Sequence, residues 1–347
     1  MRLRLIVLGL AICASVSAAE RDSARLGALA GKPYRPPWGP LPVMRNYASF
    51  APFLREELSS RDAGLRARSA FLLGQIGCRE SSKLLARRLR DRERDVRVQS
   101  GIALACLGDA RGIPVCEAVL KSDLPWIRYY AAYGLWRIGT PRANRILREG
   151  LPGQGKLVST AINGALSTRR TIPPSVRPAK SPPKLAWDDV LDAACNDFIL
   201  EGDWWWHGGD YEQGIRCMEA LVFLDPGDIE SFGVIAWLQR SLGRESESVA
   251  TLKRCIAANP KDPAAHFELG FHYMTDEKYA LAEPDLRRSV ELGGDHLCIR
   301  QYANCLEKLG RPREALELWS KLLAMRPNDS AARFNCDRLA KLLAAGK

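Results

Sequence analysis

The sequence predicts an all-α protein made of two α-solenoids joined by a proline-rich linker, and three observations carry this prediction. A segment recurs three times with an offset of 31 residues, at 65–77, 96–108 and 127–139. After residue 187 a second pattern recurs every 34 residues, and a proline-rich stretch separates the two series. Self-similarity with such a period is the signature of stacked helical repeats, because one unit cannot bury its apolar face alone.

The first residues have the pattern of an export signal. Two arginines precede an apolar run at 5–14, and a small-residue cleavage site follows at 16–18. The run is shorter than the roughly 20 residues that span a bilayer. We therefore expect residues 1–19 to be a cleavable signal peptide. The mature chain is then expected to be periplasmic or secreted and to have no transmembrane segment. It is not expected to be a lipoprotein, because Ile12 is bulky where a lipid-attachment signal needs a small residue.

Two proline-rich segments flank the first series of repeats. Residues 20–47 form an N-terminal segment in which prolines exclude a helix from Pro33 to Pro42. Residues 171–186 contain five prolines and predict a semi-rigid, extended linker. The linker places the domain boundary between a first domain at 48–170 and a second domain at 187–347.

The distribution of charge also separates the chain into two parts. The whole chain has a formal net charge of +11. Residues 48–170 contain 22 Lys and Arg against 11 Asp and Glu, whereas residues 187–347 contain 19 against 27. A basic part joined to an acidic part favours two domains and leaves open a contact between them.

Each 31-residue unit is predicted to hold two helices, of which the second carries the most regular features. An arginine near the start of that helix and a glycine at its end recur in every unit, with small residues between them. The arginines are Arg66, Arg97 and Arg128, and the glycines are Gly77, Gly108 and Gly139. A glycine there can end the helix in the left-handed conformation. These segments resemble HEAT repeats, in particular the short HEAT-like repeats of phycobilin lyases, and the resemblance implies a HEAT-like domain at 48–170.

The three arginines have two interpretations. They can form a basic ridge, with one guanidinium per repeat, that binds phosphate or carboxylate groups. Alternatively, they hydrogen-bond neighbouring repeats and nearby acidic groups, and the sequence favours this interpretation. The dense basic run at 87–94 adds positive charge to the same domain. No nucleic-acid partner is expected, because the run lacks interleaved aromatic residues and the chain is predicted to be exported.

The second domain resembles tetratricopeptide (TPR) repeats. Four units follow one another, and Pro226, Pro260 and Pro327 close three of them. Residues 331–343 are then expected to form a final capping helix. In TPR proteins, four positions of each first helix face a concave groove, and the resemblance implies an apolar strip with a polar rim here. The implied partner-binding residues are Trp206, Trp237, Phe267, Phe271, Met274, Asp203, Arg240, Arg300 and Asn304.

Aromatic anchors with a polar rim are what a peptide-binding groove needs. The alternative is that these rings pack between repeats or under the linker. Three consecutive tryptophans cannot all face the core of one helix, because neighbouring residues lie about 100° apart. The TPR resemblance implies that Trp205 fills a packing position and that Trp206 faces the groove, and Trp204 is then expected to lie outward.

No catalytic or metal-binding motif is present in the sequence. The four histidines form no HExxH, no CxxC exists, and no nucleophile or phosphate-binding signature occurs. The cysteines fall mostly at apolar helical positions, which favours buried thiols and leaves room for one or two disulfides. We predict a non-catalytic scaffold or adaptor of the bacterial cell envelope that binds a protein or peptide, without a cofactor or metal. Two alternatives are a tetrapyrrole-handling, lyase-like accessory protein and binding of anionic polymers by the basic HEAT-like face.

Overall fold

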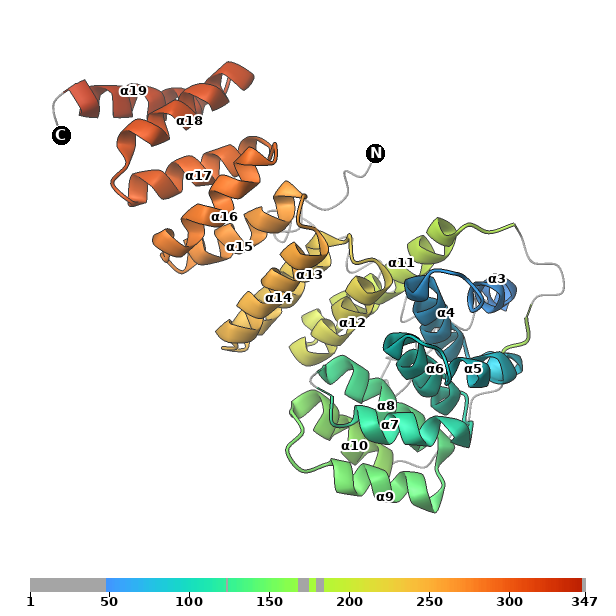
Figure 1. Cartoon of the computed structure of the whole chain (residues 1–347). Helices are drawn as coiled ribbons and strands as arrows, with labels where there is room; N and C mark the ends of the chain where they lie inside the picture. The colour runs from blue at the N-terminus through green and yellow to red at the C-terminus, as the bar shows by residue number, and fades with distance from the viewer. Residues whose placement is uncertain (1–47, 123, 168–174, 179–183, 345–347) are drawn as a thin grey trace. The chain divides into compact units, whose positions relative to one another are not determined.

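The computed structural model describes residues 48–122, 124–167, 175–178 and 184–344, and within these ranges every regular element is a helix (Figure 1). This confirms the all-α fold class. The chain divides into two compact units, Met1–Leu224 and Asp225–Lys347. The predicted signal peptide and the segment at 20–47 lie outside the described residues. No helix of the described ranges is long and apolar enough to cross a bilayer.

The first unit is a stack of short helices. A 3₁₀ turn, η2 (Ala48–Phe50), precedes the first of them, and η3 (Arg79–Ser81) and η4 (Ala110–Gly112) begin the second and third repeats. The α-helices are α3 (Ala51–Glu57), α4 (Ala63–Ile76), α5 (Ser82–Arg88), α6 (Arg94–Cys106), α7 (Ile113–Val119), α8 (Pro125–Ile138), α9 (Pro141–Gly150), α10 (Lys156–Ser167), α11 (Trp187–His207) and α12 (Tyr211–Leu224).

Local sequence explains where α4 begins and where α4, α6 and α8 end. The Asp62 carboxylate accepts a hydrogen bond from the Leu65 amide at 3.0 Å and so caps the start of α4. Gly77, Gly108 and Gly139 follow α4, α6 and α8 with φ angles of 83°, 81° and 60°. Only glycine adopts this conformation without steric cost, so the predicted helix stops are confirmed.

Small residues allow the second helices of adjacent repeats to approach closely. A Cβ atom on Gly74 of α4 would lie 2.8 Å from the Ala103 Cα of α6. A Cβ atom on Gly134 of α8 would lie 2.5 Å from the Ala105 Cβ of the same helix α6. Both separations are shorter than a van der Waals contact. The stacking of these repeats therefore depends on glycine at these two positions, where any side chain would clash with α6.

Helices α11 and α12 pack with the HEAT-like helices in the first unit. The described part of the predicted linker contacts the end of α4, where the Val176 amide donates to the Gly77 carbonyl at 3.2 Å. The Phe71 ring of α4 then contacts Phe198 of α11 and Phe223 of α12, at centroid distances of 6.1 and 5.6 Å. The boundary predicted at 171–186 therefore lies inside this compact unit. The assignment of 187–224 to a separate domain with the later repeats stays a prediction, as does an electrostatic contact between the domains.

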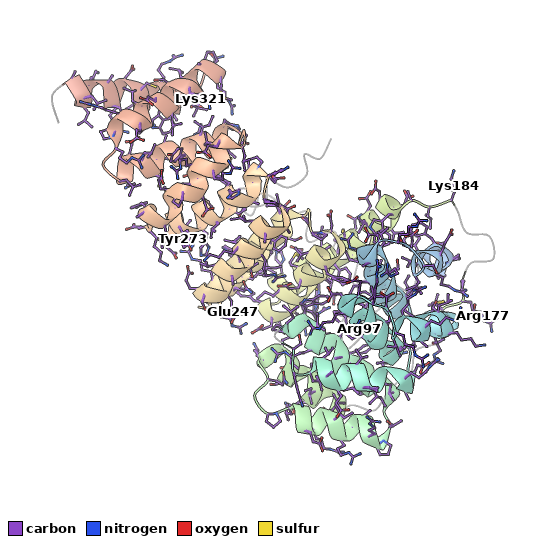
Figure 2. All side chains as sticks on the ribbon, viewed as in Figure 1. Arg97, Arg177, Lys184, Glu247, Tyr273 and Lys321 are labelled. Carbon is purple, nitrogen blue, oxygen red and sulfur yellow. The ribbon has the colours of Figure 1, made fainter. Side chains whose placement is uncertain are left out.

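The second unit consists of three helical hairpins and a last helix. Its helices are α13 (Ile229–Ser241), α14 (Glu245–Ala258), α15 (Pro263–Thr275), α16 (Tyr279–Glu291), α17 (His296–Lys308), α18 (Pro312–Met325) and α19 (Ser330–Ala344). Tyr273, labelled in Figure 2, packs against both apolar clusters of this unit and links the α13–α15 cluster to the cluster of α16–α19. Helix α19 buries Ala332 and Leu339 and leaves Phe334 exposed. Its role as a capping helix stays a prediction.

The cysteines from Cys78 to Cys336 are thiols, and most of them are buried. Burial raises the pKa of the Cys106 thiol to about 12 and that of Cys255 to about 12. A thiol with such a pKa stays protonated at neutral pH and is a poor nucleophile. These groups therefore act as small apolar side chains of the core.

Candidate functional site

Three aromatic side chains form the most exposed apolar feature of the predicted partner-binding set. Trp237 of α13 is 48% exposed, and Phe271 of α15 is 39% exposed. The Phe267 ring lies one turn before Phe271 and stacks on it, with a centroid distance of 5.7 Å and an interplanar angle of 9°. We call Trp237, Phe267 and Phe271 the aromatic face. Trp237 and Phe271 come from the first helices of successive repeats, and both rings have exposed surface that a partner can contact.

The other predicted residues of the second unit surround the aromatic face differently. Met274, like Phe267, is partly buried and packs against the apolar cluster of α16–α19. Arg240 forms an ion pair with Asp276 and donates to the Thr275 hydroxyl. Its guanidinium is thus fixed at the end of α15.

Arg300 and Asn304 lie on α17, the first helix of the following repeat. The Arg300 guanidinium lies 2.7 Å from the Asp329 carboxylate, and Asn304 is partly exposed. Arg300 therefore joins α17 to the N-terminus of α19. In this ion pair a predicted rim residue also has a structural role.

Glu245, His272 and Asp276 bring ligand-type atoms within 4.8 Å of one another. The His272 Nε2 atom lies 2.9 Å from Glu245 Oε1. Lys278 pairs with both carboxylates, at 3.4 Å from Glu245 and 2.9 Å from Asp276. Since Arg240 also pairs with Asp276, cations of the protein already balance these carboxylates. The cluster is best described as an ion-pair network that fixes Arg240 beside the aromatic face.

The remaining predicted residues, Asp203 and Trp206, are on the last turns of α11 in the first unit. His207 forms an i, i+4 pair with Asp203, at 3.4 Å from its carboxylate. The Trp205 indole donates to Glu201 at 3.3 Å and meets the Trp204 ring edge-on at 4.6 Å. All three tryptophans are partly buried, so burial does not separate the predicted packing position of Trp205 from the predicted outward position of Trp204.

Two of the three predicted ridge arginines, Arg66 and Arg97, donate to the loop that precedes their own helix. Arg66 donates to the carbonyls of Ser60 and Arg61, at 2.9 and 3.1 Å. One repeat later, Arg97 donates to the equivalent carbonyls of Asp91 and Arg92, at 2.7 and 2.8 Å. In the atypical fourth repeat the Ser159 hydroxyl makes the same bond to the Gln154 carbonyl, at 2.9 Å.

Arg66 and Arg128 also join successive repeats. Arg66 holds the Asp91 carboxylate through two hydrogen bonds of 2.8 and 2.9 Å, and this pairing keeps the pKa of Asp91 below its ordinary value. Arg128 donates to the Gln154 side chain at 2.7 Å. Arg66 and Arg128 of the predicted basic ridge thus have a structural role between repeats, Arg97 has one within its own repeat, and the role of the ridge in binding a ligand stays a prediction.

A buried charged network in the first unit was not predicted from the sequence. Arg216 of α12 donates to Glu201 of α11 at 2.6 Å and to the Tyr130 hydroxyl of α8 at 2.8 Å. Its guanidinium also lies 4.8 Å from the centre of the Tyr129 ring. Burial raises the pKa of Tyr129 to about 12, so the phenol stays neutral. One feature of the sequence could have indicated this network. Arg216 is the only Lys or Arg between Trp187 and Leu224, a segment that contains nine Asp and Glu.

Comparison with protein families finds HEAT repeats at residues 81–167 and a tetratricopeptide repeat at residues 229–262. The predicted order of the two repeat types is thereby confirmed. No curated protein matches the chain.

Solved structures resemble parts of the chain. A crystal structure of the protein MamA is 16% identical, with a TM-score of 0.36, over 43% of this chain and 82% of that chain. The crystal structure of a thermophilic TPR protein in Thermus thermophilus is 19% identical, with a TM-score of 0.34, over 46% of this chain and 91% of that chain.

Proposed function

We propose that this protein is a non-catalytic adaptor that binds an extended peptide or protein segment on the aromatic face of its TPR unit. The observation that carries the proposal is the exposure of Trp237 and Phe271 at equivalent positions of successive repeats. Large rigid rings contribute much of the binding energy at protein interfaces and lose little conformational entropy when they bind. The export-signal pattern of residues 1–19 supports a location in the bacterial cell envelope, in the periplasm or outside the cell.

The first prediction concerns these two rings. Nonapeptides selected from a random library on the purified protein should bind Trp237→Ala and Phe271→Ala at least tenfold more weakly, because each change removes an exposed anchor. Fluorescence anisotropy measures the affinities. Phe334→Ala, on α19, removes a ring that is even more exposed and should leave binding unchanged. Equal loss in all three variants, or in none, would rule out the aromatic face as the binding surface.

A second candidate function is favoured by a hollow in the HEAT-like repeats. This open hollow has a volume of about 550 Å³ and is rich in arginine. Its lining residues are Ser59, Ser60, Arg61, Arg66, Arg88, Arg90, Asp91 and Arg92. The Arg66 guanidinium already donates its hydrogen bonds to Asp91 and the loop carbonyls. Arg61, Arg90 and Arg92 are exposed, so their guanidinium groups can contact a ligand. Several guanidinium groups around one hollow can bind an anionic polymer.

The prediction for this hollow is a loss of retention on heparin. Arg90→Glu should elute at lower salt than the wild-type protein, since it reverses a charge on the hollow. Arg145→Glu makes the same change on the exposed surface of α9 and should elute close to the wild type. Arg97→Glu is unsuitable, because Arg97 bonds the loop before α6. If both test variants shift equally, overall charge rather than the hollow governs binding.

A further inference from the structure

Two glutamates of successive repeats face each other beside the aromatic face. Glu230 is in the first turn of α13, and Glu268 lies between Phe267 and Phe271 in the sequence of α15. A Cβ atom on Gly233 would lie 3.0 Å from Glu268 Oε2, so the Glu268 side chain extends to α13 one turn after Glu230. Gly233 leaves the room that this side chain occupies. Both glutamates are partly buried, and no described residue forms an ion pair or hydrogen bond with either carboxylate.

This arrangement raises the free energy of the charged pair. Burial, followed by the charge of Asp228, raises the pKa of Glu230 to about 7. Burial, followed by the charge of Glu230, raises the pKa of Glu268 to about 7. Two carboxylates that share a partly buried site are each destabilised by lost hydration and by the other. A cation placed between them would relieve both effects.

The surroundings of the pair favour an organic cation over a metal ion. Phe267 and Phe271 flank Glu268 along α15, and Trp237 lies two turns after Glu230 on α13. The alkyl stem of a lysine or arginine packs on such rings, and its charged end is attracted to their faces. A hydrated metal ion would gain nothing from this apolar surface.

We propose that the surface formed by Glu230, Glu268 and the aromatic face binds a lysine or arginine side chain of the partner peptide. The charged end lies between the two carboxylates, and the stem lies on Phe271 and Trp237. This inference rests on the proposed peptide-binding function and specifies the chemistry of the partner: an extended segment with a basic residue beside apolar ones. The aromatic face alone predicts an apolar ligand, whereas the carboxylates add a requirement for positive charge.

The test uses four pools of fluorescent nonapeptides whose central residue is Lys, Arg, norleucine or Glu and whose other positions are randomised. The full-length protein should bind the Lys and Arg pools about tenfold more tightly than the norleucine pool, and the Glu pool most weakly. Glu268→Gln should remove the preference for Lys over norleucine. This variant should fold, because the change removes repulsion without removing volume, and circular dichroism checks that it does.

A matched control is Glu247→Gln, which changes an exposed glutamate of α14, labelled in Figure 2, and should keep the preference. Each outcome has a distinct meaning. Equal binding of the Lys and norleucine pools by the wild type would overturn this inference and leave the proposed function intact. Binding of none of the pools would overturn the proposed function itself. A preference that survives Glu268→Gln would also overturn the inference.

Binding of the Lys pool should also depend on pH. Between pH 8 and pH 6 the two glutamates take up protons, so affinity for the Lys pool should fall severalfold while affinity for the norleucine pool stays constant. The other ionisable groups near the pair are Asp228, Asp262 and the Cys255 thiol, whose pKa of about 12 keeps it neutral in this range. His266, also on α15, pairs with Asp285 at 3.1 Å. Glu268→Gln separates the contributions: a pH dependence that persists in this variant would contradict the assignment to the pair.

Discussion

Replacement of Arg216 by methionine is expected to lower the free energy of unfolding of the protein by about 3–5 kcal/mol. The Arg216 side chain is 3% exposed, and it is the only cation paired with the buried Glu201 carboxylate among the described residues. Methionine fills much of the same volume but leaves that negative charge in the core without a cation, and the Trp205 indole remains as its hydrogen-bond donor. The Tyr130 hydroxyl loses its hydrogen bond as well. Urea unfolding, followed by near-ultraviolet circular dichroism, measures the change.

A double variant shows whether charge is the cause. Arg216→Met combined with Glu201→Leu removes both charges and should recover most of the lost stability, because apolar residues often replace a buried ion pair without cost. Arg145→Met, at an exposed position of α9, controls for the loss of an arginine and should change stability by less than about 0.5 kcal/mol. If the double variant is less stable than Arg216→Met alone, the cation–π contact with Tyr129 and the packing of the long side chains matter more than the charge.

The sequence predicted the fold class and the helix ends because these depend on local and repeated signals. Gly77, Gly108 and Gly139 each end a helix, and the same pattern occurs three times, so chance is excluded. The packing of α11 and α12 against the HEAT-like repeats could not be predicted from such signals. The contacts of Phe71 with Phe198 and Phe223 join residues far apart in the chain, and no periodicity connects them. The TPR register assigns a helix to its repeat but does not say which neighbours it packs against.

The candidate site was predictable to the extent that it follows the TPR register. Equivalent positions gave Trp237 and Phe271, and both are exposed. Glu268 was missed because it is not one of the four groove positions of a TPR helix. Its approach to Glu230 depends on the absence of a side chain at Gly233. For Arg66 and Arg97 the sequence left two interpretations open, because the loop carbonyls that accept their hydrogen bonds are backbone atoms of any residue type.

The second large effect is expected from truncation within the first unit. A fragment of residues 48–224 should unfold cooperatively, whereas a fragment of residues 48–186 should be largely unfolded or lack fixed packing. The shorter fragment loses the partners of Phe71, since Phe198 stacks on it and Phe223 meets its edge. It also uncovers Trp126, which contacts Phe223 at 5.5 Å.

The expected magnitude follows from the burial that is lost. Each large apolar side chain that leaves the core costs about 1.5–3 kcal/mol, and each aromatic pair adds about 0.5–1.5 kcal/mol. Loss of Val190, Phe198 and Phe223 therefore removes an amount comparable with the whole stability of a domain, about 5–15 kcal/mol. Near-ultraviolet circular dichroism and binding of a hydrophobic dye distinguish the two fragments.

The same experiment decides where the first domain ends. If residues 48–186 prove as stable as residues 48–224, then α11 and α12 contribute little to this core, and the boundary predicted at 171–186 is the energetic one. If the longer fragment alone is stable, the first two helices of the TPR-like register belong energetically to the HEAT-like repeats. The complementary fragment 225–347 should then fold without them, because its three hairpins and α19 have their own apolar clusters. The peptide-binding surface could in that case be studied in isolation from the basic HEAT-like repeats.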